Sequence, residues 1–214
     1  MPLLSHALHL GPLDNNSYVV ACPSTREAAA IDVGFDPEAV IRLIRDQNLT
    51  LRYLLNTHAH YDHVAGMDTV QRACGGEYWV HPADHALLDR LREQGAAFGF
   101  PPADPPADRH DLADGQRLKL GEEELLVIHT PGHSPGGVCF LWNGDLWAGD
   151  MLFSGSVGRT DLPGGSFGIL ARAIRERLFT LGDDVRVHPG HGPETTIGEE
   201  RRHNPFVGVE ANLA

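Results

Sequence analysis

A short segment in the first third of the chain carries the residues best suited to chemistry. Residues 57–63 (THAHYDH) contain His58, His60, Asp62 and His63. The chain has 13 histidines in all, and neutral imidazole is a common ligand of zinc and related metals. A loop can direct such alternate and adjacent side chains toward two neighbouring metal positions. The segment therefore predicts a metal site.

Three later residues are candidates to complete that site. His133, Asp150 and His191 each stand next to a glycine at the end of an apolar stretch, where loops often carry function. A single histidine after a strand is usually a surface or hydrogen-bonded residue. The seven residues together would be enough for two metals that share a carboxylate, so we expect metal binding.

The surrounding elements are expected to place the first cluster on a strand-to-helix loop. Residues 51–56 (LRYLLN) predict a buried strand that runs straight into the cluster, and residues 64–73 have helical composition. Earlier in the chain, Asp36 and Pro37 predict the start of a helix that ends near Gln47. Further strands are predicted over residues 17–22, 28–33 and 77–80.

The second half is predicted to repeat the order of strands, helix and strand. Its strands are expected over residues 116–120, 124–128, 137–142, 145–148 and 185–188, and its helix over residues 169–181. A turn at Asn143 and Gly144 joins two of these strands. Two such halves can pack their sheets face to face with the helices outside. The sequence therefore predicts an α/β fold.

The segment between the halves is predicted to carry no obvious chemistry. Residues 82–92 predict a helix with Asp84, Asp89 and Arg90 on its solvent side. Residues 95–106 contain several prolines, which interrupt regular structure. This stretch is expected to be either a linker or a flap over the site.

Composition excludes several classes of protein. The 214 residues are 42% hydrophobic and 21% charged, which is typical of a globular protein. With 17 basic and 29 acidic side chains, the formal net charge of −12 disfavours a nucleic-acid partner. No run of about 18 apolar residues predicts a membrane span, and the N-terminus does not resemble a signal peptide, so we expect a cytoplasmic protein. Three widely spaced cysteines fit neither a disulfide framework nor a CxxC metal site.

The order of four motifs resembles a known family. THAHYDH, TPGHSPG, WAGD and HPGHGP follow one another as in the metallo-β-lactamase superfamily, and specifically as in its short, single-domain glyoxalase II-like (hydroxyacylglutathione hydrolase-like) branch. The resemblance implies a four-layer αβ/βα sandwich of two packed mixed β-sheets, with helices outside and the site at one edge. It also implies that residues 1–214 are a single domain, without the C-terminal helical domain that supplies glutathione contacts in full-length glyoxalase II.

The same resemblance implies the roles of the candidate ligands. One metal would be held by His58, His60 and His133, a second by Asp62, His63 and His191, with Asp150 bridging both. Zinc is the expected metal, and iron or manganese are alternatives. A hydroxide between the two divalent ions would attack a thioester, either S-lactoylglutathione or a related acyl-thiol, with Asp62 orienting it and Asp150 offsetting the metal charge. The expected partner is therefore a small-molecule thioester, and the sequence leaves the oligomeric state open.

A substrate-binding residue is implied by the family's substrate loop, which corresponds to residues 158–161 (GRTD). Arg159 could clamp a carboxylate of the substrate as a planar fork, or it could brace the loop against Asp161. The family's tyrosine is absent from this loop, which disfavours glutathione as the thiol.

Two related activities are weighed against thioester hydrolysis. A GRTD-like loop also resembles that of persulfide dioxygenases, which would use one iron held by His58, His133 and Asp150. That activity is the alternative. The β-lactamases proper have no bridging aspartate at the position of Asp150, so the resemblance disfavours lactam hydrolysis.

Overall fold

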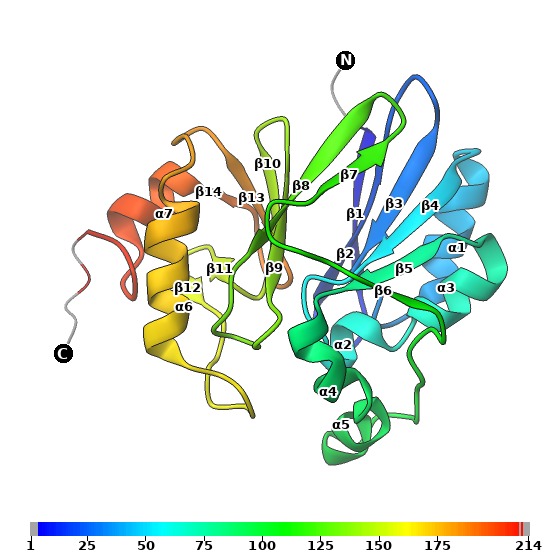
Figure 1. The fold of residues 1–214 in the computed structure, drawn as a ribbon, viewed down its shortest axis with the longest axis horizontal. Coiled ribbons are helices and arrows are strands. Elements are labelled where there is room, and N and C mark those ends of the chain that lie inside the picture. The colour runs from blue at the N-terminus through cyan, green and yellow to red at the C-terminus, as the bar shows by residue number, and fades with distance from the viewer. Residues whose placement is uncertain (1–3, 210, 212–214) are drawn as a thin grey trace.

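The computed structural model describes residues 4–209 and 211, and two six-stranded β-sheets dominate it (Figure 1). The first sheet has the order β1 (Leu4–Leu10), β2 (Asn15–Ala21), β3 (Glu27–Ile31), β4 (Thr50–Leu55), β5 (Glu77–Val80) and β6 (Arg109–Asp111). The second has the order β14 (Thr195–Thr196), β13 (Arg186–Pro189), β10 (Asp145–Gly149), β9 (Val138–Trp142), β8 (Glu123–His129) and β7 (Arg117–Leu120). Both sheets contain parallel and antiparallel pairs. A separate hairpin pairs β11 (Leu152–Phe153) with β12 (Ser156–Val157).

Alternation of side chains along the strands builds four layers. On β3, Ala28 and Ala30 pack toward the outer helices, whereas Ala29 and Ile31 pack toward the second sheet. On β10, Trp147 lies between the sheets and is fully buried. Because successive residues of a strand point to opposite faces, strands covered on both faces must be apolar at nearly every position. The predicted sandwich of two mixed sheets with helices outside is confirmed.

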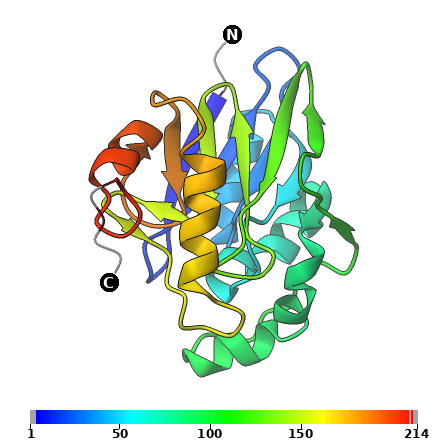
Figure 2. The ribbon, with the colours of Figure 1, turned by 60° about the vertical axis from the view of Figure 1, so that its left-hand side comes forward.

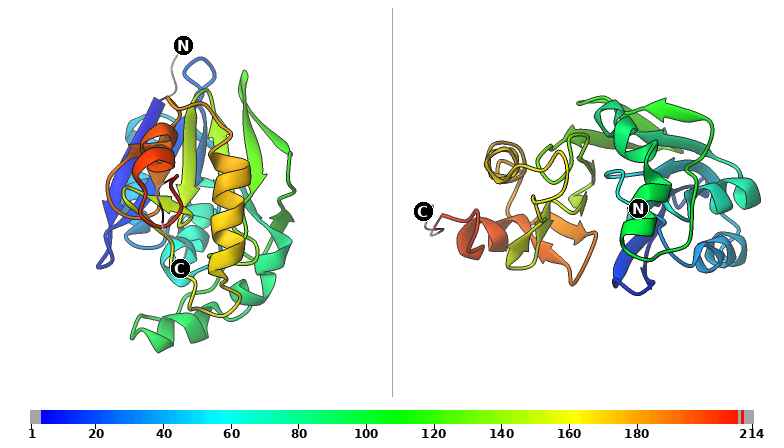
Figure 3. Two further views of the ribbon diagram at one scale, coloured as in Figure 1. Left: turned by 90° about the vertical axis from the view of Figure 1, so that its left-hand side faces the viewer. Right: turned by 90° about the horizontal axis from the view of Figure 1, so that it is seen from below.

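Helices cover the outer face of each sheet (Figures 2 and 3). Beside the first sheet, α1 (Pro37–Asp46) and α3 (Met67–Cys74) contribute buried residues to the core. Beside the second sheet, α6 (Phe167–Ala173), the π-helical turn η2 (Ile174–Leu178) and α7 (Ile197–His203) do the same. The short helices α2 (Tyr61–Val64), α4 (His85–Leu88) and α5 (Leu91–Ala97) lie at the lower edge in Figure 1. Among the described residues, no helix is both long and apolar enough to cross a membrane.

The predicted helices differ from the observed ones in their bounds and continuity. The helix predicted over residues 64–73 is divided between α2 and α3, because the chain turns at Gly66, whose N–H donates to the Val33 carbonyl. The helix predicted over residues 169–181 begins earlier, at Phe167, and continues as η2. The sequence also did not predict β1, whose side chains alternate between exposed and half-buried along most of its length.

The helix predicted over residues 82–92 is wrong as one continuous element. It consists of a 3₁₀ turn, η1 (Pro82–Asp84), followed by α4 and the start of α5. Asp89 and Arg90 are exposed as predicted, whereas Asp84 is 0% exposed. The tighter 3₁₀ turn changes which side chains share a face, so an α-helical period places Asp84 on the wrong side.

The loops expected to carry chemistry emerge at one edge of the sandwich. β8 and β10 are both antiparallel to β9 and therefore run in the same direction, and β13 is parallel to β10. The loops that follow these three strands thus leave the second sheet on the same side. There they meet the loop that follows β4 of the first sheet.

Candidate metal centre

All seven predicted ligands lie at this edge. His58 and His60 stand on the loop after β4, Asp62 and His63 in α2, His133 on the loop after β8, Asp150 directly after β10, and His191 two residues after β13. The structure brings six of them into two triads, His58 with His60 and His133, and Asp62 with His63 and His191, each with its ligand atoms within 4.8 Å of one another.

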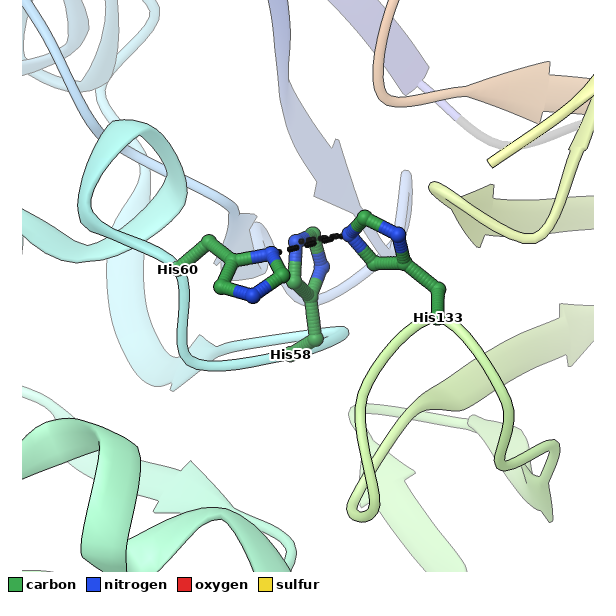
Figure 4. Close-up of side chains that lie close together, drawn as sticks. All are labelled: His58, His60 and His133. Carbon is green, nitrogen blue, oxygen red and sulfur yellow. Dashed lines mark hydrogen bonds between the residues drawn. The ribbon is translucent and has the colours of Figure 1, made fainter. Parts of the chain in front are cut away.

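The first triad has the spacing of ligands around one ion. His133 Nε2 lies 3.1 Å from His58 Nε2 and 2.9 Å from His60 Nδ1 (Figure 4). At a Zn–N distance of about 2.05 Å, tetrahedral geometry separates neighbouring nitrogens by roughly 3.3 Å. The three rings converge from two separate loops, so this spacing is a property of the fold rather than of one turn.

The far side of two of these rings fixes where their lone pairs point. His133 Nδ1–H donates to the Arg159 carbonyl at 2.7 Å, and His58 Nδ1–H donates to Thr57 Oγ1 at 3.0 Å. Thr57 accepts this bond because its own hydroxyl donates to Asp32 at 2.6 Å. Both Nε2 atoms therefore present lone pairs to each other, an arrangement that repels unless a cation lies between them.

That cation is better supplied by a metal than by a proton. Burial, reinforced by the neighbouring imidazoles, holds the pKa of His58 well below its usual range and lowers the pKa of His60 to about 3. Burying a charged imidazolium costs its hydration. A divalent ion instead binds the neutral imidazole that burial favours. The donor set of the first triad therefore fits a metal ion.

The second triad is held in the same way. His191 Nε2 and His63 Nε2 lie 3.3 Å and 3.5 Å from Asp62 Oδ2. On their far sides, His63 Nδ1–H donates to Asp32 at 3.2 Å and His191 Nδ1–H donates to the Leu13 carbonyl at 2.9 Å. Partners of this kind orient histidine ligands and raise their basicity.

Asp150 faces both triads. Its Oδ1 lies 3.6 Å from His63 Nε2, and its Oδ2 lies 3.6 Å from both His133 Nε2 and His191 Nε2. Within the described part of the chain, His63 Nε2 and Asp150 Oδ1 are buried without a hydrogen-bond partner. Such groups are costly to leave unsatisfied. The residues fit a second ion, with Asp150 shared between the two positions.

A glycine makes this close approach feasible. A Cβ on Gly190 would lie 2.2 Å from Asp150 Oδ1 and 2.8 Å from His63 Cε1. No real Cβ tolerates such contacts, so only glycine leaves room for both ligands.

The sequence did not single out two residues that position the site. Asp32 follows β3 and is 2% exposed, and besides His63 it accepts bonds from Asn56 Nδ2 and from the N–H and hydroxyl of Thr57. Asn15 Nδ2 donates to both the carbonyl and Oδ2 of Asp62 at 3.0 Å. The signal available in the sequence was a polar residue next to an apolar strand, and that signal is weak.

The buried Asp84 ties the two halves of the first triad together. Its Oδ2 accepts from Ala59 N at 3.0 Å and from Ser134 Oγ at 2.8 Å, and its Oδ1 accepts from Gly136 N at 2.6 Å. Burial raises the pKa of Asp84, and these three bonds oppose that rise. One carboxylate thus joins the loop of His58 and His60 to the loop of His133.

The comparison with known sequences decides the family. The family model of the metallo-beta-lactamase superfamily matches residues 10–191, which include all seven candidate ligands. The chain belongs to the metallo-β-lactamase superfamily. Members of this superfamily bind metal ions, and this member holds a cluster of histidines and aspartates suited to them. Hydroxyacylglutathione hydrolase GloC from Haemophilus influenzae is 39% identical over 190 residues, which cover 87% of this chain and 90% of that protein.

Solved structures of the superfamily share the fold over nearly the whole chain. The B3 metallo-beta-lactamase BLEG-1 has a TM-score of 0.87 at 36% identity, covering 95% of this chain and 99% of its own. TTHA1623 in a di-iron-bound form also has a TM-score of 0.87, at 39% identity, covering 94% and 99%. ETHE1 from Myxococcus xanthus has a TM-score of 0.80 at 25% identity, covering 97% and 84%. Because one of these chains holds two irons, the superfamily fold does not by itself select zinc.

A cavity of about 470 Å³ opens beside the candidate ligands and is lined by five of them, His60, Asp62, His133, Asp150 and His191. Arg159 lines it, and its guanidinium forks onto both carboxylate oxygens of Asp161 at 2.7 Å. The loop brace is therefore present, and the substrate clamp stays a prediction. Phe98 and Phe100 from the proline-rich segment line the same cavity, in agreement with the flap interpretation of that segment.

Proposed function

We propose that the protein is a hydrolase that cleaves thioesters with the help of two divalent metal ions, zinc being the expected metal. One observation carries this proposal: a second triad of possible ligands lies opposite the first, and Asp150 lies near both. The second triad consists of Asp62, His63 and His191. A site with one ion would leave His63 Nε2 and Asp150 Oδ1 buried and unsatisfied. The likeness to GloC supports the thioester as substrate.

The reaction is the hydrolysis of a thioester to a carboxylic acid and a thiol. The oxygen of water bonds to the acyl carbon, the C–S bond breaks, one proton of the water ends on the thiol, and the carboxylic acid ionises. Divalent ions supply the Lewis acidity for this chemistry, since they activate water at neutral pH and polarise a carbonyl. The residues that would hold them are His58, His60 and His133 for the first ion, Asp62, His63 and His191 for the second, and Asp150 for both.

Asp62 and Asp150 are the proposed catalytic residues. Asp62 lines the cavity and is held by Asn15, so its carboxylate can accept a hydrogen bond from the attacking water and orient it. Asp150 also lines the cavity and offsets positive charge between the two positions. Arg159 is the proposed substrate-binding residue, exchanging Asp161 for a carboxylate where the substrate offers one.

We further propose that residues 1–214 form a single superfamily domain that acts in the cytoplasm. Side chains from both sheets make one shared core between them, which supports one domain. The three cysteines are free thiols, which suits a reducing compartment.

A persulfide dioxygenase is the second candidate. The GRTD loop and the likeness to ETHE1 favour it. The atoms of its iron triad are near one another, with His133 Nε2 3.1 Å from His58 Nε2 and 3.6 Å from Asp150 Oδ2. A single iron there, however, gives no role to the second triad.

Metal content and turnover, measured on one preparation, test the proposal. The protein is purified without added metal, analysed for its elements, and assayed with S-lactoylglutathione, with a glutathione persulfide under oxygen monitoring, and with a β-lactam because of the likeness to BLEG-1. About two metals per chain with thioester hydrolysis support the proposal. One iron per chain with oxygen uptake and no hydrolysis would establish the dioxygenase. Loss of metal and turnover in His58→Ala, with both retained in the His110→Ala control, would support the ligand assignment.

A further inference from the structure

The walls of the cavity are more apolar than a small hydroxyacyl group requires. The apolar side chains that line it around the candidate ligands come from loops of both halves and from the β11–β12 hairpin: Leu13, Phe98, Phe100, Phe153, Val157 and Leu162. Leu13 and Phe98 are 45% and 58% exposed. Large apolar side chains that face water at the mouth of a cavity gain free energy when a ligand covers them.

A groove of about 260 Å³ continues this cavity on the side of the first triad. It shares His60, Gln94, Phe98 and Leu162 with the cavity and adds the apolar Leu87, Ala97 and Pro163 and the ion-paired Arg90 and Glu93. It lies between α5 and the loop of residues 158–166, which reach the same end of the molecule in Figures 2 and 3. An occupant of the groove would therefore begin beside His60.

Aromatic stacking braces Phe98, the phenylalanine that lines both the groove and the cavity. Phe98 stacks on Phe100 at 6.5 Å between ring centroids, and Phe100 stacks on Tyr61 at 5.4 Å. Tyr61 lies between the candidate ligands in sequence, and its N–H is held by Gln94 at 3.1 Å. Preorganised apolar surface loses little entropy when a ligand binds.

The basic side chains on these walls are already paired with carboxylates. Among the described residues that line the cavity or the groove, the only Lys or Arg side chains are Arg159 and Arg90. Arg159 is forked onto Asp161, and Arg90 pairs with Glu93 at 2.7 Å. A carboxylate of an anionic thiol such as glutathione would therefore have to displace Asp161 from Arg159, and the net charge of −12 disfavours anionic thiols further.

We infer that the groove takes an apolar acyl chain, so that the preferred substrates are thioesters of medium-length aliphatic acids rather than of a small hydroxyacid such as lactate. This inference rests on the proposed thioester hydrolysis. In this arrangement the thioester carbonyl lies at the candidate ligands beside His60. The alkyl chain extends from there over Phe98 toward Leu162.

A chain-length series on one thiol tests the inference. The metal-replete protein is assayed with acetyl, butanoyl, hexanoyl and octanoyl thioesters of N-acetylcysteamine, and with S-lactoylglutathione. We expect kcat/KM to rise roughly three- to fourfold per methylene that enters the groove. Octanoate should also inhibit more strongly than butanoate, as a product that occupies the same groove.

Three variants test whether the groove, rather than the general hydrophobicity of the protein surface, sets the preference for long acyl chains. Phe98→Ser and Leu162→Ser should each lower the ratio of octanoyl to butanoyl kcat/KM at least tenfold. Phe206→Ser, which alters another exposed phenylalanine outside the cavity, should keep the wild-type ratio. A flat chain-length series, or equal ratios in Phe98→Ser and Phe206→Ser, would overturn the acyl groove and leave the hydrolase standing. No hydrolysis of any thioester would overturn the hydrolase and the groove with it.

Discussion

Replacing Asp84 with asparagine should weaken both the fold and the metal site, although Asp84 is not a ligand. The carboxylate accepts three bonds, at Oδ2 from Ala59 N and Ser134 Oγ and at Oδ1 from Gly136 N. Asparagine offers one oxygen, so in either orientation its NH₂ faces a backbone N–H. A lost charge-assisted bond is worth roughly 1.5–3 kcal/mol and an unpaired buried N–H costs about 1–3 kcal/mol. Asparagine also avoids the burial cost that raises the pKa of Asp84. The net expectation is a loss of about 2–4 kcal/mol, or roughly 4–16 °C in Tm for a domain of this size.

Thermal unfolding and metal titration, each on the chelator-treated protein, measure this effect. Metal affinity should fall about 10- to 100-fold, as when an outer partner of a ligand is lost, because the loops of His60 and His133 are no longer joined. Asp89→Asn is the matched control, since Asp89 is exposed and only pairs with Arg109 at 2.9 Å. Ser134→Ala removes one donor and should give a smaller loss of the same kind. If Asp84→Asn matches Asp89→Asn in both Tm and metal affinity, the proposed link between the two loops is wrong.

Three further predictions concern the second triad. Gly190→Ala should bring the metal content down to about one ion per chain by elemental analysis, because its Cβ would meet Asp150 Oδ1 at 2.2 Å, whereas Gly182→Ala, in open space, should keep both ions. Asp32→Asn should weaken metal binding about 10- to 100-fold through His63, and a titration that shows unchanged affinity would contradict the role of Asp32. Finally, Asp62 and Asp150 raise the pKa of His63 to about 10 although burial opposes them. Since this folded-state pKa exceeds the unfolded value of about 6.5, its stabilisation of the metal-free protein is complete below about pH 6.5 and is lost as the pH rises toward 10, with a slope of at most about 1.4 kcal/mol per pH unit. Denaturant titrations should show this loss in wild type and not in His63→Gln.

The candidate ligands could be singled out from the sequence because residue type and local spacing indicate metal-binding chemistry, and the structure brings them together at one edge. His58, His60 and His63 stand within six residues on the loop after β4 and in α2, and the strand before them was recognisable from its apolar run. Asp84 could not be predicted in the same way. Its partner Ser134 is 50 residues away, and an α-helical period applied to a 3₁₀ turn assigned it to solvent. The acyl groove was equally hidden, since Phe98 and Leu162 meet only after α5 and the loop after β12 are folded against the same edge.

The two buried carboxylates explain how one short loop can serve two metal positions. Asp32 holds the loop from the side of the first sheet, through the N–H and hydroxyl of Thr57 and through His63. Asp84, in the 3₁₀ turn after β5, holds it through Ala59 N and connects it through Ser134 to the loop after β8 of the second sheet. The loop is thus fixed at both ends before a metal arrives, which reduces the reorganisation that binding would otherwise require. The positions of metal ligands must be kept within about 0.5 Å for function. Asp32 and Asp84 therefore matter to the site as much as the candidate ligands whose loop they hold.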